Sequence, residues 1–181
     1  MKIILETERL QLRQFTTDDN KYLLPIMQNK EVNKFISLEH VFGPINHEYV
    51  EKMLERFFKT YESNGFGLLG VVYKKTNELI GWCGLHKMQL KDGEVIELAY
   101  TLDKKYWGQG LATEAAIAVK NYTFNTLKLP YIVSCIDSKN VASIKVAKKL
   151  GMQYWKDSEF FGKSCQVYKV ENEINKRELD N

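Results

Sequence analysis

Three observations predict an α/β (α+β) fold, built as a mixed, mostly antiparallel sheet with helices on both faces. The first is a run of three strand-like segments separated by short turns, which favours an antiparallel meander. The second is the alternation of helical and strand-like segments after this meander, and the third is the strand and two helices that precede it. Together these segments predict one sheet sandwiched between helices.

The first part of the chain predicts one strand and two helices. Residues 9–13 alternate between polar and apolar in the manner of a half-buried strand. Threonines and aspartates then supply N-cap candidates and first-turn acids for a helix over residues 16–27. Residues 33–46 indicate a loop, and apolar side chains at helical spacing over residues 49–61 predict a second helix that ends before Gly65.

The middle of the chain predicts the meander. Its strands cover residues 66–74, 79–88 and 94–102. Asp92-Gly93 stands between the last two, and Asp-Gly between apolar runs is a strong hairpin signal. The later elements are a helix over residues 111–122, a strand over residues 131–137, a short helix ending at Gly151, strands over residues 152–156 and 165–170, and a polar tail over residues 171–181.

Composition limits the class of protein. The chain has 181 residues, 44% of them apolar and 27% charged, and it shows no repeat or linker, so one domain over residues 1–181 is expected. The net charge is +3 and the lysines are dispersed, so neither nucleic acid nor a membrane is the expected partner. The apolar run of residues 3–5 is too short for a secretory segment, which predicts a cytoplasmic location.

The residues that often bind metals are scattered. Cys83, Cys135 and Cys165 are widely spaced and form no CxxC pair, which indicates reduced thiols and no metal. The three histidines, at positions 40, 47 and 86, show no metal-ligand spacing and are interpreted as structural or surface groups.

The most informative segment is Gly108-Gln109-Gly110-Leu111-Ala112, which connects a predicted strand directly to a helix. Glycines allow a sharp turn, successive N–H groups can point at one anion, and the helix adds its positive end. A pyrophosphate is the expected occupant, although a simple tight connection is an alternative. Residues 65–70 also satisfy GxGxxG, but a strand follows them, so no dinucleotide site is expected there.

The segments at residues 97–102 and 106–115 resemble the acetyl-CoA signature of the GNAT superfamily of N-acetyltransferases. Residues 5–13 and 140–152 are similar to the opening strand and the second coenzyme A segment of the branch that acetylates ribosomal-protein N-termini. The resemblance implies acetyl-CoA as cosubstrate, a primary amine as acceptor and no metal. The cofactor-binding residues that it implies are Leu98, Tyr100, Thr101, Leu102, Lys105, Gly108, Gln109, Gly110, Leu111, Ala112, Thr113, Asn140 and Ser143.

The chain departs from the superfamily pattern at two positions. Lys105 stands where Gln or Arg is usual, a change of little consequence if that residue contributes its backbone amide. Ala147 stands where many relatives have a tyrosine, so a tyrosine acid is absent at that position.

Acetyl transfer to an amine requires a base, an oxyanion donor and an acid for the departing thiolate. Glu97 is the candidate base, directly or through water, and an exposed strand carboxylate is the alternative interpretation. Main-chain groups of residues 98–102 are implied to meet the pantetheine arm and the thioester carbonyl. Ser143 is the candidate acid, with a helix cap or surface role as the alternative.

The expected acceptor is a peptide or protein N-terminal α-amine. The alternatives are a polyamine or antibiotic acceptor, or a non-catalytic acyl-CoA-binding sensor. The sequence leaves open whether the chain forms a homodimer.

Overall fold

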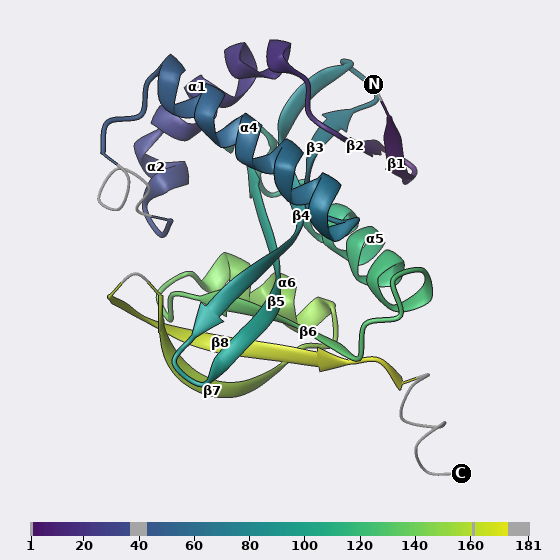
Figure 1. The fold of residues 1–181 in the computed structure, drawn as a ribbon, viewed down its shortest axis with the longest axis vertical. Helices are drawn as coiled ribbons and strands as arrows, with labels where there is room; N and C mark the ends of the chain where they lie inside the picture. The colour runs from purple at the N-terminus through teal and green to yellow at the C-terminus, as the bar shows by residue number, and fades with distance from the viewer. Residues whose placement is uncertain (1, 37–42, 161, 174–181) are drawn as a thin grey trace.

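The computed structural model describes residues 2–36, 43–160 and 162–173. One eight-stranded sheet runs through it in the order β1-β2-β3-β4-β5-β6-β8-β7 (Figure 1). All neighbouring strands are antiparallel except β5 and β6. The strands are β1 (Ile3–Glu6), β2 (Leu10–Arg13), β3 (Leu68–Tyr73), β4 (Glu78–Leu90), β5 (Gly93–Leu102), β6 (Tyr131–Ile136), β7 (Gln153–Phe160) and β8 (Lys163–Glu171).

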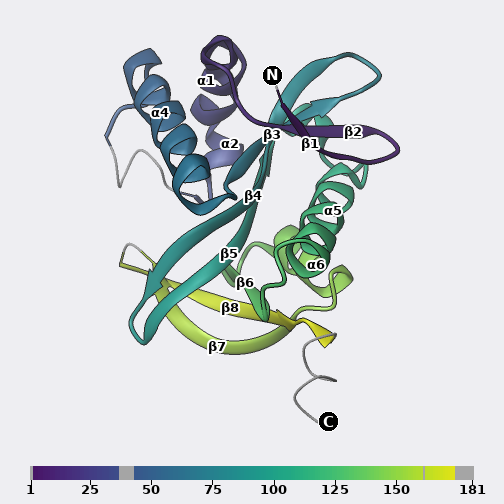
Figure 2. The same ribbon diagram turned by 45° about the vertical axis from the view of Figure 1, so that its right-hand side comes forward.

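Helices cover both faces of this sheet, as Figure 2 shows: α1, α2 and α4 lie on one side, and α5 and α6 on the other. The predicted mixed, mostly antiparallel sheet between helices is therefore confirmed. The helices are α1 (Asn20–Gln28), α2 (Lys30–Asn33), α4 (His47–Asn64), α5 (Leu111–Asn125) and α6 (Val141–Lys149), with 3-10 turns η1 (Thr17–Asp19) and η2 (Lys104–Tyr106).

Alternate residues of the strands contribute to two hydrophobic cores, because successive side chains of a strand point to opposite faces of the sheet. Val71 is buried in the core with α5 residues such as Ala115, whereas its neighbour Val72 is buried with α1 and α4 residues such as Leu23. A third cluster, around Met88, Leu90, Val95, Val133 and Val167, covers the β4–β5 hairpin and has no helix residue among its buried members.

Most predicted elements are present, with three differences. Strand β1 and the four-residue α2 were not predicted; the side chain of Asn29 starts α2 by accepting from the Glu31 and Val32 N–H groups. Strands β7 and β8 extend further than predicted. The predicted loop at residues 33–46 and the polar tail fall partly on residues 37–42 and 174–181, which lie outside the described residues.

Among the described residues, no helix has the length and apolar character needed to span a bilayer.

Candidate active site

A glycine loop joins η2 to α5 at one end of β5. Gly108 has φ +73° and Gly110 has φ +78°, in the left-handed region that residues with a Cβ rarely adopt. Gly110 is the N-cap of α5, and its carbonyl accepts the first helical bond, from Glu114 N at 3.0 Å.

The loop presents unpaired donors. Among the described residues, the backbone N–H groups of residues 108–113 have no hydrogen-bond acceptor. Several of these groups belong to the first turn of α5, where the helix carries partial positive charge. The predicted cradle is therefore built to accept an anion, and a diphosphate suits its several donors. A cavity of about 740 Å³ between the β1–β2 turn and α5 borders this loop at Gly110 and Thr113.

Strands β5 and β6 separate next to this loop. Their parallel ladder has one residue pair, Glu97 with Val133. One residue further along, the Ser134 hydroxyl donates to the Leu98 carbonyl at 2.8 Å, in place of a backbone partner. In the part of the chain that the structure describes, the β5–β6 ladder has no further pair beyond this point, so β5 has a partly unpaired edge.

Along residues 98–102 of β5, the main-chain groups of every second residue point toward β6. Since the Leu98 carbonyl points toward β6, the main-chain groups of Tyr100 and Leu102 point the same way. The carbonyl of Thr101 points to β4 instead, where a Cβ on Gly81 would lie 2.1 Å from it. The Leu102 carbonyl accepts from the Trp107 indole at 2.8 Å, which leaves the Tyr100 N–H and carbonyl facing the gap.

Glu97 lies where the strands part. Its side chain is 8% exposed. One carboxylate oxygen accepts from the Cys135 N–H at 2.8 Å, and the other lies 2.6 Å from His86 Nε2. The residue is therefore a buried, hydrogen-bonded carboxylate and not the exposed strand residue that was the alternative interpretation.

His86, interpreted from the sequence as a structural or surface group, is the side-chain partner of Glu97. It stands directly opposite Glu97 in the β4–β5 ladder, and its side chain is 29% exposed. Its Nδ1 lies 3.2 Å from the Lys87 carbonyl, so both ring nitrogens face acceptors, which favours the doubly protonated imidazolium. Burial lowers the pKa of His86, but the Glu97 carboxylate and the Lys87 carbonyl outweigh it and raise the pKa overall.

Tyr100 and Ser143 lie on the other face of the sheet. Tyr100 packs against the core formed with α5, and Ser143 is in the first turn of α6. Burial raises the pKa of Tyr100 to about 12, partly opposed by the nearby Ser143 hydroxyl. The two hydroxyls are neighbours without hydrogen-bond geometry, because the buried Tyr100 oxygen has no partner among the described residues. An unsatisfied buried hydroxyl is costly, so this atom is suited to bind a ligand.

The remaining predicted contacts already have protein partners. The Asn140 side chain caps α6 by accepting from Ser143 N at 3.2 Å. The Lys105 amide donates to the Asp103 carboxylate at 3.2 Å, and the Lys105 ammonium lies 3.4 Å from Glu78. Their roles toward a cofactor stay predictions.

The arrangement has two sides. Leu98 packs on the α5 side, so its neighbour Glu97 points to the opposite face, where His86 also lies. A carbonyl group held in the gap between β5 and β6 would have a carboxylate on one side and two hydroxyls, those of Tyr100 and Ser143, on the other. This geometry suits proton removal on one face and proton donation on the other.

The described residues include no group of three His, Cys, Asp or Glu side chains placed to hold one metal ion. None of the three cysteines forms a disulfide with another described residue. Cys135 is half-buried, and its backbone N–H donates to Glu97. Of the histidines considered as metal ligands, His40 lies outside the described residues.

Comparisons with known proteins identify the family and the fold. A family model described as an acetyltransferase (GNAT) domain matches residues 9–153. Over 153 residues, the chain is 32% identical to YoaA of Bacillus subtilis strain 168, which is named an uncharacterized N-acetyltransferase; the alignment covers 83% of this chain and 82% of YoaA.

Two solved structures show the same fold. An acetyltransferase from Agrobacterium tumefaciens strain C58 superimposes with a TM-score of 0.78 at 26% identity, over 94% of this chain and 96% of that chain. RimL, a ribosomal L7/L12 α-N-protein acetyltransferase solved in complex with coenzyme A, gives a TM-score of 0.79 at 15% identity, over 94% and 98% of the two chains.

Proposed function

Because the chain belongs to the GNAT acetyltransferase family and is an acetyl-CoA-dependent N-acetyltransferase, we propose that it acetylates the α-amine of a peptide or protein N-terminus, with Glu97 as the base. The observation that carries this proposal is the buried Glu97 carboxylate at the point where β5 and β6 separate. The family also favours an enzyme over the non-catalytic sensor considered from the sequence.

The chemistry of the acceptor favours an α-amine. Its reference pKa is about 8, against about 10.4 for a lysine side chain, so a modest base suffices to keep it neutral. RimL, which shares the fold, is named for acetylating a protein α-amine.

The proposed reaction uses both sides of the gap. The amine nitrogen attacks the thioester carbonyl carbon from the Glu97 face, and its proton passes to the Glu97–His86 pair after His86 has lost its imidazolium proton. The Tyr100 main-chain N–H donates to the developing oxyanion. As the carbon–sulfur bond breaks, the thiolate takes a proton from the Ser143 hydroxyl, which is reprotonated from solvent. The Tyr100 phenol supports this transfer on the same face.

Thiol release from acetyl-CoA with a panel of amines tests this proposal. The panel contains a peptide with a free N-terminus, the same peptide blocked at its N-terminus but carrying a lysine, spermidine, and an aminoglycoside. The expected result is release with the first peptide and, by mass spectrometry, an acetyl group on its α-amine. Release with spermidine or the aminoglycoside alone would contradict the N-terminal acceptor and favour a small-molecule acetyltransferase.

A further inference from the structure

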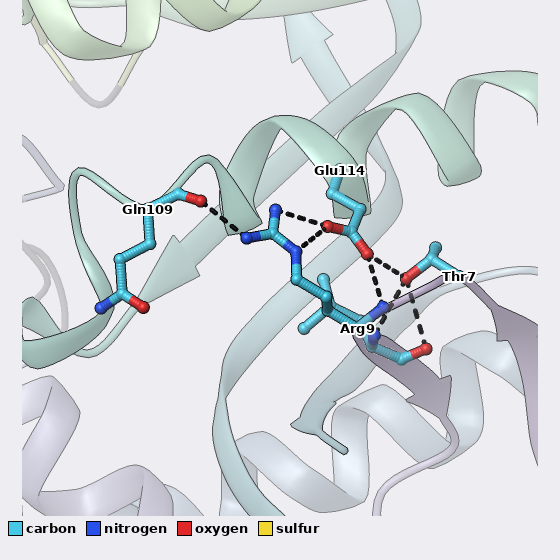
Figure 3. A network of polar contacts seen from close by, with 5 residues as sticks. Thr7, Arg9, Gln109 and Glu114 are labelled. Atoms are coloured by element: carbon cyan, nitrogen blue, oxygen red, sulfur yellow. Dashed lines mark hydrogen bonds and ion pairs between the residues drawn. The ribbon is translucent and has the colours of Figure 1, made fainter. Parts of the chain in front are cut away.

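A polar network ties the β1–β2 turn to the glycine loop, although about a hundred residues separate them in the sequence (Figure 3). The Arg9 guanidinium donates to the Glu114 carboxylate through Nε at 2.7 Å and lies 2.6 Å from it through Nη2. The same carboxylate accepts from the Thr7 hydroxyl at 2.6 Å and from the Arg9 N–H at 2.9 Å. The remaining guanidinium nitrogen, Nη1, donates to the Gln109 carbonyl at 3.0 Å.

The bond to Gln109 fixes the orientation of a peptide group inside the cradle. In a trans peptide, the carbonyl of one residue and the N–H of the next point in opposite directions. No cis peptide bond occurs among the described residues. Because Arg9 holds the Gln109 carbonyl on its own side, the Gly110 N–H points to the other side of the loop. A flipped peptide would instead present a carbonyl oxygen to the bound anion.

The network also neutralises a charge at the anion site. Glu114 lies in the first turn of α5, one turn after the Gly110 cap. Burial raises the pKa of Glu114, but hydrogen bonds from Thr7 and Arg9 outweigh this effect and lower it, so the carboxylate is ionised. Without the guanidinium, this negative charge would oppose a diphosphate bound at the same helix end.

We infer that Arg9 is a positioning residue for coenzyme A: it holds the Gln109–Gly110 peptide with its N–H toward the diphosphate and keeps Glu114 turned away from it. This inference rests on the proposed use of the loop as the diphosphate site. Arg9 itself acts through the loop, since three of its side-chain nitrogens are already bound to protein oxygens.

Calorimetric titration of Arg9→Met with coenzyme A tests the inference. Losing a charged hydrogen bond that orients one donor corresponds to about a tenfold weaker Kd. In steady-state kinetics, the KM for acetyl-CoA rises by a similar factor while kcat stays within about twofold, because no reacting atom is touched. With S-acetylpantetheine, which lacks the diphosphate, kcat/KM is unchanged.

Three further variants define the effect. Lys74→Met removes a cation that donates to the Thr7 carbonyl at 2.7 Å but does not contact the loop, and it leaves the Kd unchanged. Arg9→Lys keeps the charge but cannot bind Glu114 and Gln109 at the same time, so it weakens coenzyme A binding about threefold. This variant replaces Arg9→Met in the titration if Arg9→Met misfolds. In Arg9→Met with Glu114→Gln the charge is balanced, yet the Gln109 carbonyl is still unheld, and binding stays weak.

Three results would overturn the inference: a folded Arg9→Met variant with the wild-type Kd, an equal loss with S-acetylpantetheine, or full recovery in the double variant. Wild-type protein that fails to bind coenzyme A would instead refute the proposed function.

Discussion

Replacing Glu97 with Gln removes the proposed base and leaves its surroundings nearly intact. In the wild type the Cys135 N–H lies 2.8 Å from the carboxylate, and in the variant the amide oxygen can still accept from it. The amide nitrogen can donate to a neutral His86. The change in the free energy of unfolding should therefore stay below about 1 kcal/mol. An amide cannot accept the amine proton, so kcat should fall by about 10² to 10⁴, or about 3 to 5 kcal/mol in the barrier.

Two comparisons make this result specific. Glu94→Gln makes the same change on the same strand, at a side chain that is 55% exposed, and should keep wild-type kcat. Glu97→Ala leaves the Cys135 N–H without an acceptor in a buried site and should cost about 1 to 3 kcal/mol of stability as well as activity. The assay is thiol release from acetyl-CoA with a free N-terminal peptide, together with thermal unfolding. A folded Glu97→Gln variant whose kcat lies within about threefold of wild type would refute Glu97 as the base.

Four further substitutions test the other parts of the site. Tyr100→Phe removes a buried hydroxyl that has no partner among the described residues, so it should stabilise the fold by about 1 kcal/mol yet lower kcat. Ser143→Ala should lower kcat by about tenfold. If both variants had the kcat of wild type, neither hydroxyl would be the acid. The raised pKa of His86 predicts that kcat increases with pH through a midpoint above 6.5, since the pair accepts a proton only after the imidazolium has lost one. His86→Gln should move this midpoint to lower pH, and an unmoved profile would separate His86 from the proton path. Gly110→Ala forces a Cβ onto φ +78° and should cost about 1 to 2 kcal/mol in thermal unfolding and weaken coenzyme A binding, whereas an unchanged Kd would argue against the cradle.

The stability contribution of the Glu97–His86 pair also depends on pH. Because folding raises the pKa of His86, the contribution is fully present below the unfolded value of about 6.5 and is lost as pH rises through the folded pKa. Chemical unfolding of wild type and His86→Gln at several pH values should show the difference shrinking toward high pH.

Local patterns predicted most of the fold. The Asp92-Gly93 signal placed the β4–β5 hairpin, and the side chain of Asn140 and the αL residue Gly65 mark helix ends as expected from capping rules. Strand β1 was missed because its apolar run is only three residues long and its pairing with β2 depends on a tight turn at residues 7–10.

The partners within the site depend on register and tertiary packing. The pairing of His86 with Glu97 could have been predicted from the sequence. A hairpin that pairs Leu90 with Gly93 fixes the register, and stepping four residues away from the turn on each strand pairs His86 with Glu97. The Tyr100 hydroxyl, which has no partner among the described residues, could not be predicted in this way, since its position near Ser143 depends on how distant segments pack together. The Arg9–Glu114 contact joins segments 105 residues apart, and a single sequence carries no local pattern for such a contact.

The most direct test of the two-sided site is a structure of the protein with coenzyme A and an acceptor peptide bound together. The diphosphate is expected to accept hydrogen bonds from N–H groups of residues 108–113. The sulfur is expected on the Tyr100 and Ser143 side, and the peptide α-amine on the Glu97 and His86 side. A peptide amine bound on the same face as Ser143, with Glu97 out of its reach, would contradict this arrangement.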